Sequence, residues 1–228
     1  MRHEQSRSND VSGMTGNYMA SVDFGAPTSD VAIVQDFLTS WTVPSVPVAP
    51  NDDKVIYIWN GLQAREQPVG IQPLLAWHPG RGSWCISCMY TKDGVDYWET
   101  GQINVNPGDT LQGHMAFLEK IEDKYRYRLE FTGSKYWNTG RNLDMPCPLN
   151  TILLCVEPYT TNYLDLPPDP LIKMRDISVT VTPHDGLQPI LEYIDWKFSN
   201  NGVVTPSKMN GAVISHANGT GEVDFYFR

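Results

Sequence analysis

Apolar and polar residues alternate along most of this chain with the two-residue period of β-strands. In residues 55–59, valine, tyrosine and tryptophan fall on one face and two isoleucines on the other. Residues 124–131 and 222–227 alternate between apolar and mostly charged side chains. Helical periodicity is almost absent. Successive strand residues point to opposite faces of a sheet, so the pattern predicts sheets with one packed face and one wetter face.

Turn-forming sequences separate these strands at short intervals. Residues 106–109 (Asn-Pro-Gly-Asp) are typical of a turn, and the proline-rich segments 43–50 and 166–170 are typical of extended connections. Many short strands at even spacing predict an all-β fold, a two-sheet antiparallel β-sandwich. Residues 1–28 are poor in apolar side chains, which predicts a flexible N-terminal tail ahead of a single sandwich domain over residues 29–228.

Composition and charge narrow the classes of partner. The 228 residues carry a formal net charge of −9 and no basic run, which argues against nucleic acid, because phosphate contacts need clustered lysine and arginine. No apolar run approaches the roughly 20 residues of a membrane span, and residues 1–25 lack the apolar stretch of a signal peptide. We therefore expect no membrane partner and a cytoplasmic location for the chain as written, or secretion if a leader was removed.

Recognisable metal-binding and nucleophile motifs are missing from the sequence. The five histidines are scattered without an HExxH motif, and there is no GxSxG motif. Cys85 and Cys88 have the spacing of half a zinc site, but residues three apart in a strand face opposite ways. We predict no metal, no cofactor and buried free thiols, with a disulfide between Cys147 and Cys155 only in an exported protein.

Two polar residues stand out because they lie in apolar strand segments. Gln72 shares a strand face with Leu74 and Ala76, where an unpaired amide is costly. Glu157 closes the apolar run 151–156, an environment that raises a carboxyl pKa and suits a general acid or base. An amide donor stabilises an oxyanion formed when water attacks a carbonyl. The alternative is that Glu157 ends a strand at the surface and Gln72 bonds to neighbouring backbone.

Several short motifs resemble those of the glutamic peptidases (eqolisins), acid endopeptidases with a concanavalin-A-like jelly roll. The similarity runs from about residue 38 to residue 182. It is carried by Trp41-Thr42-Val43-Pro44, Trp59-Asn60-Gly61-Leu62-Gln63, Ile71-Gln72, the aromatic strand from Ser83-Trp84 to Tyr90, Pro107-Gly108-Asp109, Val156-Glu157, Leu166-Pro167-Pro168 and 177–181.

This resemblance implies roles for individual residues. Glu157 takes the place of the catalytic glutamate, a general base toward water and then a general acid toward the leaving amine. Gln72 takes the place of the glutamine that holds and polarises the scissile carbonyl. Tyr57, Trp59 and Gln63 would line the substrate cleft. The family strand also carries a second glutamate, and matching Glu157 to that one leaves Leu153 in the catalytic position.

Three functional hypotheses follow, none of which needs a cofactor. The first is an acid hydrolase of the glutamic-peptidase type that uses Gln72 and Glu157. The second is a non-catalytic carbohydrate-binding, lectin-like sandwich, because exposed tryptophan and tyrosine stack on sugar rings. The third is a structural or interaction protein that offers a sheet edge or face to a partner. The expected ligand is accordingly a polypeptide or a glycan.

Overall fold

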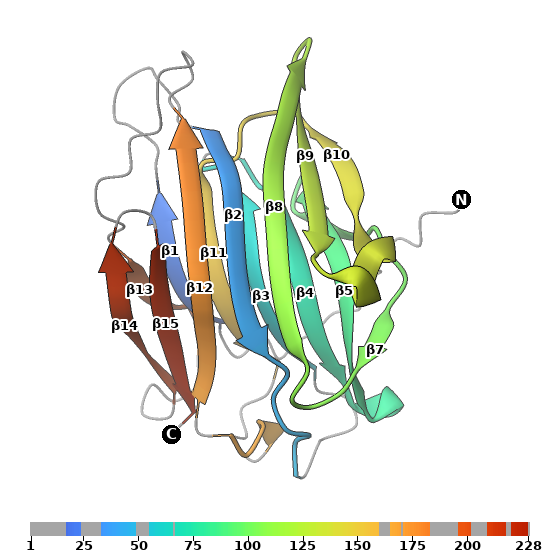
Figure 1. Cartoon of the computed structure of the whole chain (residues 1–228), viewed down its shortest axis with the longest axis vertical. Coiled ribbons are helices and arrows are strands. Elements are labelled where there is room, and N and C mark those ends of the chain that lie inside the picture. The colour runs from blue at the N-terminus through green and yellow to red at the C-terminus, as the bar shows by residue number, and fades with distance from the viewer. Residues whose placement is uncertain are drawn as a thin grey trace.

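The computed structural model describes residues 17–23, 33–48, 55–65, 67–159, 165–169, 171–182, 196–201, 209–217 and 220–227. These residues build two antiparallel sheets stacked face to face (Figure 1). The eight-stranded sheet consists of β1 (Asn17–Asp23), β3 (Ile56–Gln63), β4 (Gly70–His78), β5 (Ser83–Lys92), β6 (Val95–Trp98), β7 (Ile103–Val105), β11 (Thr151–Pro158) and β13 (Lys197–Asn201). Its order is β13-β1-β11-β3-β4-β5-β6, and β7 also pairs with β5.

The second sheet has seven strands in the order β10-β9-β8-β2-β12-β15-β14. These strands are β2 (Ile33–Thr42), β8 (Thr110–Ile121), β9 (Lys124–Phe131), β10 (Arg141–Met145), β12 (Leu171–Thr182), β14 (Met209–Ala217) and β15 (Thr220–Phe227). Two short 3₁₀ turns, η1 (Pro79–Arg81) and η2 (Ser134–Thr139), follow β4 and β9. The predicted two-sheet antiparallel sandwich is confirmed.

Large apolar side chains from the inner faces of both sheets fill the space between them. Trp77 and Trp84 come from the eight-stranded sheet, and Phe37 and Tyr127 come from the seven-stranded one; all are almost completely buried. Burial of such aromatic residues contributes the largest share of the hydrophobic stabilisation, at about 25 cal/mol per Å² of apolar surface. The alternation in the sequence thus fixes which side chains of each strand point into this core.

One buried polar contact joins the two sheets directly. Asn60 of β3 is fully buried, and its side-chain amide donates to the backbone carbonyl of Gly113 in β8 at 3.1 Å. An added Cβ at Gly113 would overlap the Asn60 side chain. Glycine is therefore required at this close approach, and the contact sets the position of β3 relative to the opposite sheet.

The N-terminal boundary differs from the sequence prediction. Residues 17–23 fall inside the segment predicted as a flexible tail, yet they form β1, which pairs with β11 on one side and β13 on the other. Ala20 is fully buried there. The polar flanking residues masked this short strand, whose stability comes from pairing with distant strands rather than from its own composition.

All four cysteines are free thiols. Cys85, Cys88 and Cys155 are buried, and Cys147 is half-buried. Burial raises the pKa of the Cys85 thiol to about 11 and that of Cys88 to about 12.

Within the described ranges, none of the helical segments has the length and apolar character that a membrane crossing requires.

Candidate functional site

The candidate residues lie on the outer face of the eight-stranded sheet, the face that points away from the sandwich core. On β3, Ile56, Ile58 and Leu62 join the main core, whereas Tyr57 and Trp59 belong to a separate cluster. That outer cluster consists of Trp59, Leu74, Met89, Leu153 and Cys155, with Tyr57 and Trp98 packed against it. By strand alternation, Gln72 and Glu157 project from this same face.

Strand register fixes where Glu157 lies on this face. Glu157 of β11 pairs with Tyr57 of β3, and Tyr57 pairs with Ala76 of β4. The β4 residue level with Glu157 is therefore Ala76, four residues away from Gln72.

Gln72 lies level with a different residue of β11. The pairs Leu62–Ile71 and Trp59–Leu74 bracket Gln72, so the same register sets it opposite Gly61. Gly61 in turn pairs with Leu153. Leu153, not Glu157, is the β11 residue across from Gln72, and Leu153 is only 2% exposed.

The two candidate catalytic residues are thus well separated. Four residues along a strand correspond to about 13 Å, and two strand spacings add about 9.6 Å across the sheet. A single water bridges polar atoms only about 5.5 Å apart. The Gln72 amide and the Glu157 carboxyl group share a face, but the register does not bring them to one reacting centre.

The indole ring of Trp59 occupies the space between these positions. Its Nε1–H donates to Glu157 Oε2 at 3.3 Å. An added Cβ at Gly61 would lie 2.9 Å from Cζ3, at the opposite edge of the same ring. Trp59 is 4% exposed, so its ring extends from the level of Gly61 toward Glu157 as a packed wall.

Glu157 is a half-buried carboxyl group held by neutral donors. Besides the Trp59 bond, Oε1 accepts a hydrogen bond from the Tyr159 hydroxyl at 3.0 Å. Burial raises the pKa of Glu157 above its ordinary value, the two hydrogen bonds oppose that shift, and the nearby charge of Asp96 adds to it. The described part of the chain places no lysine or arginine in an ion pair with Glu157.

Aromatic rings gather around this carboxyl group. The ring centroid of Tyr57 lies 5.5 Å from that of Tyr159, 6.5 Å from that of Trp98 and 6.3 Å from that of His78, each in an edge-to-face arrangement. Burial, followed by the Glu157 charge, raises the pKa of Tyr57 to about 12, so the phenol stays neutral. Tyr57, Trp98 and Tyr159 are half-buried, which leaves part of each ring accessible.

The surroundings of Gln72 and Gln63 are different. Gln72 is half-buried and pairs with Met89 across β5, and its side chain makes no hydrogen bond to another described residue. Gln63 is exposed at the end of β3, between Gly70 and Thr151 of the neighbouring strands. Tyr57 and Trp59 accompany Glu157, whereas Gln63 lies beyond Gln72 at the other end of the face.

Sequence reasoning missed Tyr159, Trp98 and the position of Leu153. Tyr159 follows Glu157 by two residues, so strand alternation is the signal that would have paired them. Trp98 reaches Tyr57 from β6, at the edge of the sheet, and Leu153 depends on the pairing of β11 with β3. Contacts between segments so far apart in sequence leave no local pattern.

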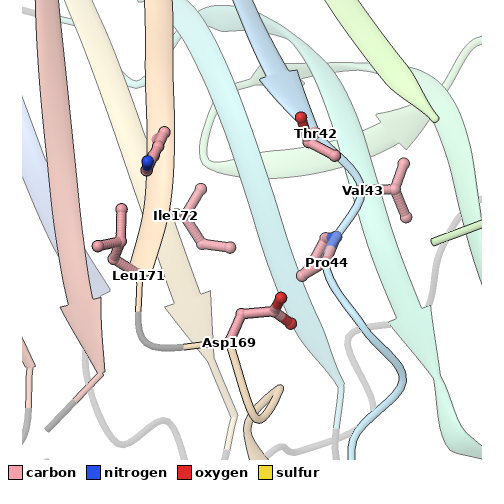
Figure 2. A pocket seen from close by; sticks show the side chains of 7 residues that line it. Thr42, Val43, Pro44, Asp169, Leu171 and Ile172 are labelled. Carbon is pink, nitrogen blue, oxygen red and sulfur yellow. The ribbon is translucent and has the colours of Figure 1, made fainter. Parts of the chain in front are cut away.

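Two cavities that described residues line contain neither Gln72 nor Glu157. One, of about 330 Å³, lies between the segment from Thr42 to Pro44 and the segment around Asp169 and Leu171 (Figure 2). Its carboxylate is already engaged, because Asp169 accepts hydrogen bonds from the Ser45 backbone N–H at 2.7 Å and from the Ser45 hydroxyl at 3.3 Å. The Asp169 carboxylate beside this cavity is therefore occupied by its hydrogen bonds to Ser45.

The second cavity has the same volume of about 330 Å³ and lies between β5 of the eight-stranded sheet and β9 and β10 of the seven-stranded one. It is lined by Tyr90, Lys92, Glu99, Arg126, Asn142, Leu143, Asp144 and Met145. Arg126 and Asp144 pair with each other at 2.8 Å. Within the described ranges, no three histidine, cysteine or acidic side chains gather in a way that would hold a metal ion; the absence of a cofactor stays a prediction.

Comparison with known proteins finds structural but not sequence similarity. No family model matches the chain, and no curated protein matches it by sequence. The fold is similar to that of scytalido-glutamic peptidase, solved with a transition state analog inhibitor, with a TM-score of 0.56 and 14% identity over 94% of this chain and 98% of that one.

A second solved structure gives the same result. SCP-B, a member of the eqolisin family of peptidases solved in complex with the tripeptide Ala-Ile-His, has a TM-score of 0.50 and 14% identity, again over 94% of this chain and 98% of that one. The structural resemblance to glutamic peptidases, expected from the short motifs, is confirmed. At this identity the likeness establishes the shared jelly-roll sandwich, and function has to be argued from the site.

Proposed function

We propose that this protein binds an extended polypeptide on the outer face of its eight-stranded sheet and that Gln72 and Glu157 do not form a catalytic pair. The observation that carries the proposal is the register, in which Leu153 lies level with Gln72 and Glu157 lies level with Ala76. The glutamic-peptidase fold supports a polypeptide ligand, since one structural neighbour is a complex with a tripeptide.

Chemistry supports the same conclusion. Peptide hydrolysis by such a pair needs a carboxyl group that activates water within hydrogen-bond reach of the carbonyl held by the amide. The aliphatic side chain of Leu153 neither accepts nor donates a proton. This matches the alternative alignment in which Glu157 corresponds to the second glutamate of the family strand. Gln72 would then help to hold a bound chain rather than polarise a scissile bond.

A hydrolase centred on Glu157 alone is the second candidate. It is favoured by the likeness to two peptidases over 94% of the chain and by the raised pKa of a half-buried carboxyl group, which suits a general acid or base. In this version Tyr159 and Trp59 would orient the carboxyl group. Acid-dependent cleavage that Glu157→Gln abolishes and Gln72→Ala leaves intact would select it.

The experiment measures binding and cleavage on the same samples. A reduced, unfolded protein and a set of random peptides are incubated with the protein from pH 3 to pH 7, followed by size-exclusion chromatography and mass spectrometry. We expect intact peptides to coelute with the protein. Glu119→Gln serves as the matched control, because Glu119 lies on the other sheet, where it pairs with Arg126. Binding to a glycan array without peptide binding would overturn the proposal in favour of a lectin-like protein.

A further inference from the structure

We propose that Glu157 and the rings of Tyr57, Trp98 and Tyr159 form a pocket that recognises the cationic side chain of lysine or arginine in a bound polypeptide. This inference rests on the proposed function and names the side-chain chemistry that the site selects. The pocket, called the Glu157 pocket below, lies beside the paired residues Glu157 of β11 and Tyr57 of β3. Trp98 of β6 pairs with Met89, the residue opposite Gln72, and its ring reaches from there to Tyr57.

The charge balance around Glu157 is the first argument. Two other partly buried acidic groups of the described chain have a basic partner: Asp224 pairs with Arg175 at 2.6 Å, and Glu130 pairs with Arg128 at 2.8 Å. Asp169, by contrast, is bonded to Ser45. Among the described residues, the hydrogen-bond donors to Glu157 are the neutral groups of Trp59 and Tyr159. Buried carboxylates are normally compensated by a cation, so this position lacks the partner that its ionised form needs.

The aromatic surroundings are the second argument, independent of the first. Organic cations bind over the faces of tyrosine and tryptophan rings, and the attraction grows as water is removed. Tyr57, the cross-strand neighbour of Glu157, packs edge-to-face against both Trp98 and Tyr159, so the orientations of the three rings are fixed before a ligand arrives. A ring enclosure with a carboxylate at its base matches an alkylammonium or guanidinium group on an aliphatic stem.

Among the described neighbours, Arg81 carries a positive charge that acts on His78 and Cys85 but does not shift the pKa of Glu157. Asp96 of β6 is acidic, Cys85 and Cys155 are thiols whose pKa values burial raises, and the pKa of His78 is lowered by burial and by Arg81. His78 is therefore neutral at pH 7. The titratable groups that face Glu157 from β3, β4, β5, β6 and β11 thus leave the pocket neutral or negative.

Binding of a cation should release a proton from this pocket. Burial raises the pKa of Glu157, and a bound cation favours the ionised carboxylate, so binding should lower this pKa and release protons from the molecules that hold one. The ligand keeps its own protons, and the proton of Glu157 passes to the buffer. Titration calorimetry in two buffers with different ionisation enthalpies detects this release.

The test uses N-acetyl-lysine methylamide and N-acetyl-arginine methylamide, with N-acetyl-norleucine methylamide as the neutral control of matched length. At pH 6 we expect the lysine and arginine probes to bind at least ten times more tightly than the norleucine probe. We expect a buffer-dependent binding heat in the wild type, and at least a tenfold loss of affinity in Glu157→Gln. Equal affinity for the norleucine probe would overturn the inference.

A second variant guards against a folding defect. Tyr159→Phe keeps the ring and removes the hydroxyl donor to Glu157, so it should retain preference for the cationic probes with a native near-ultraviolet spectrum. Loss of that preference would count against the ring enclosure. Polypeptide binding without preference for lysine or arginine would refute this inference and leave the proposed function standing. Binding of the cationic probes without binding of a polypeptide would refute the proposed function alone.

Discussion

The outer faces of the two sheets handle charge in opposite ways. On the seven-stranded sheet, the polar groups pair with each other: His114 with Asp36 at 2.9 Å, Arg128 with Glu130 at 2.8 Å and Arg126 with Asp144 at 2.8 Å. On the eight-stranded sheet, the outer face carries a buried apolar cluster, and the described hydrogen-bond donors to its Glu157 carboxyl group are neutral.

This difference indicates which face is built for a ligand. A network of exposed ion pairs satisfies its own charges and contributes little to stability, so it describes a solvated surface. An accessible carboxyl group among aromatic rings, without a described basic partner, has unused binding capacity. We therefore infer that the eight-stranded sheet recognises the ligand and that the seven-stranded sheet presents a solvated surface.

The largest expected effect comes from removing the ring that separates Gln72 from Glu157. Trp59→Ala should lower the free energy of unfolding by about 3–5 kcal/mol, the usual cost of truncating a large buried side chain. Trp59→Phe should cost less, because it keeps most of the packing and loses only the N–H donor to Glu157. Guanidinium unfolding measures the loss of stability in both variants. Equal losses would show that packing of the aromatic ring does not stabilise the fold at this position.

A smaller effect concerns the pH dependence of stability at Glu157. Its folded-state pKa is raised above the ordinary 4.5, so the folded protein holds this proton where the unfolded chain has released it. The associated stability is fully present below about pH 4.5 and is lost as the pH rises through the folded pKa. Unfolding at pH 4 and pH 7 should show a loss in the wild type that is reduced in Glu157→Gln. A loss of the same size in the variant would contradict the raised pKa.

On the other sheet, His114 should produce a pH effect with a different midpoint. Hydrogen bonding to Asp36 raises the pKa of His114, burial opposes it, and Glu130 adds to it. A raised histidine pKa contributes stability that is present below about pH 6.5 and is lost as the pH rises through the folded value. We expect His114→Gln to flatten this segment of the profile between pH 6 and pH 8, by less than about 1 kcal/mol because Asp36 is 43% exposed.

The smallest effect is expected for the ion pair between Arg128 and Glu130. Their side chains are 35% and 25% exposed, so Arg128→Gln should change the free energy of unfolding by at most about 1 kcal/mol. Affinity for peptides should not change, because the pair lies on the sheet opposite the Glu157 pocket. A loss of peptide binding in this variant would move the recognition surface to the seven-stranded sheet.

Sequence alternation was enough for the sandwich but not for the site. The period-two pattern in 55–59 and 124–131 predicts strands with one packed face, and the structure places both segments accordingly. The same alternation correctly puts Gln72 and Glu157 on one face. Which residues lie level with each other depends on pairing among β11, β3 and β4. Gln72 and Leu153, for example, lie level in the sheet but are 81 positions apart in the sequence.

The short N-terminal strand failed for a related reason. Residues 17–23 contain few strongly apolar side chains, so their local pattern resembles that of the polar residues before them. Their strand conformation depends on hydrogen bonds to β11 and β13, which no local window contains. The alignment of Gln72 with Leu153 and the pairing of residues 17–23 both depend on contacts between distant segments, which composition and periodicity do not encode.

The central claim is that the outer face binds a polypeptide without a Gln72–Glu157 catalytic pair. The most direct measurement is mass spectrometry of an unfolded protein after prolonged incubation with the wild type, Gln72→Ala and Glu157→Gln at pH 3–7. We predict intact substrate in all three samples, with wild-type protein retaining it on a size-exclusion column. Cleavage by the wild type that each of the two substitutions abolishes would contradict the account.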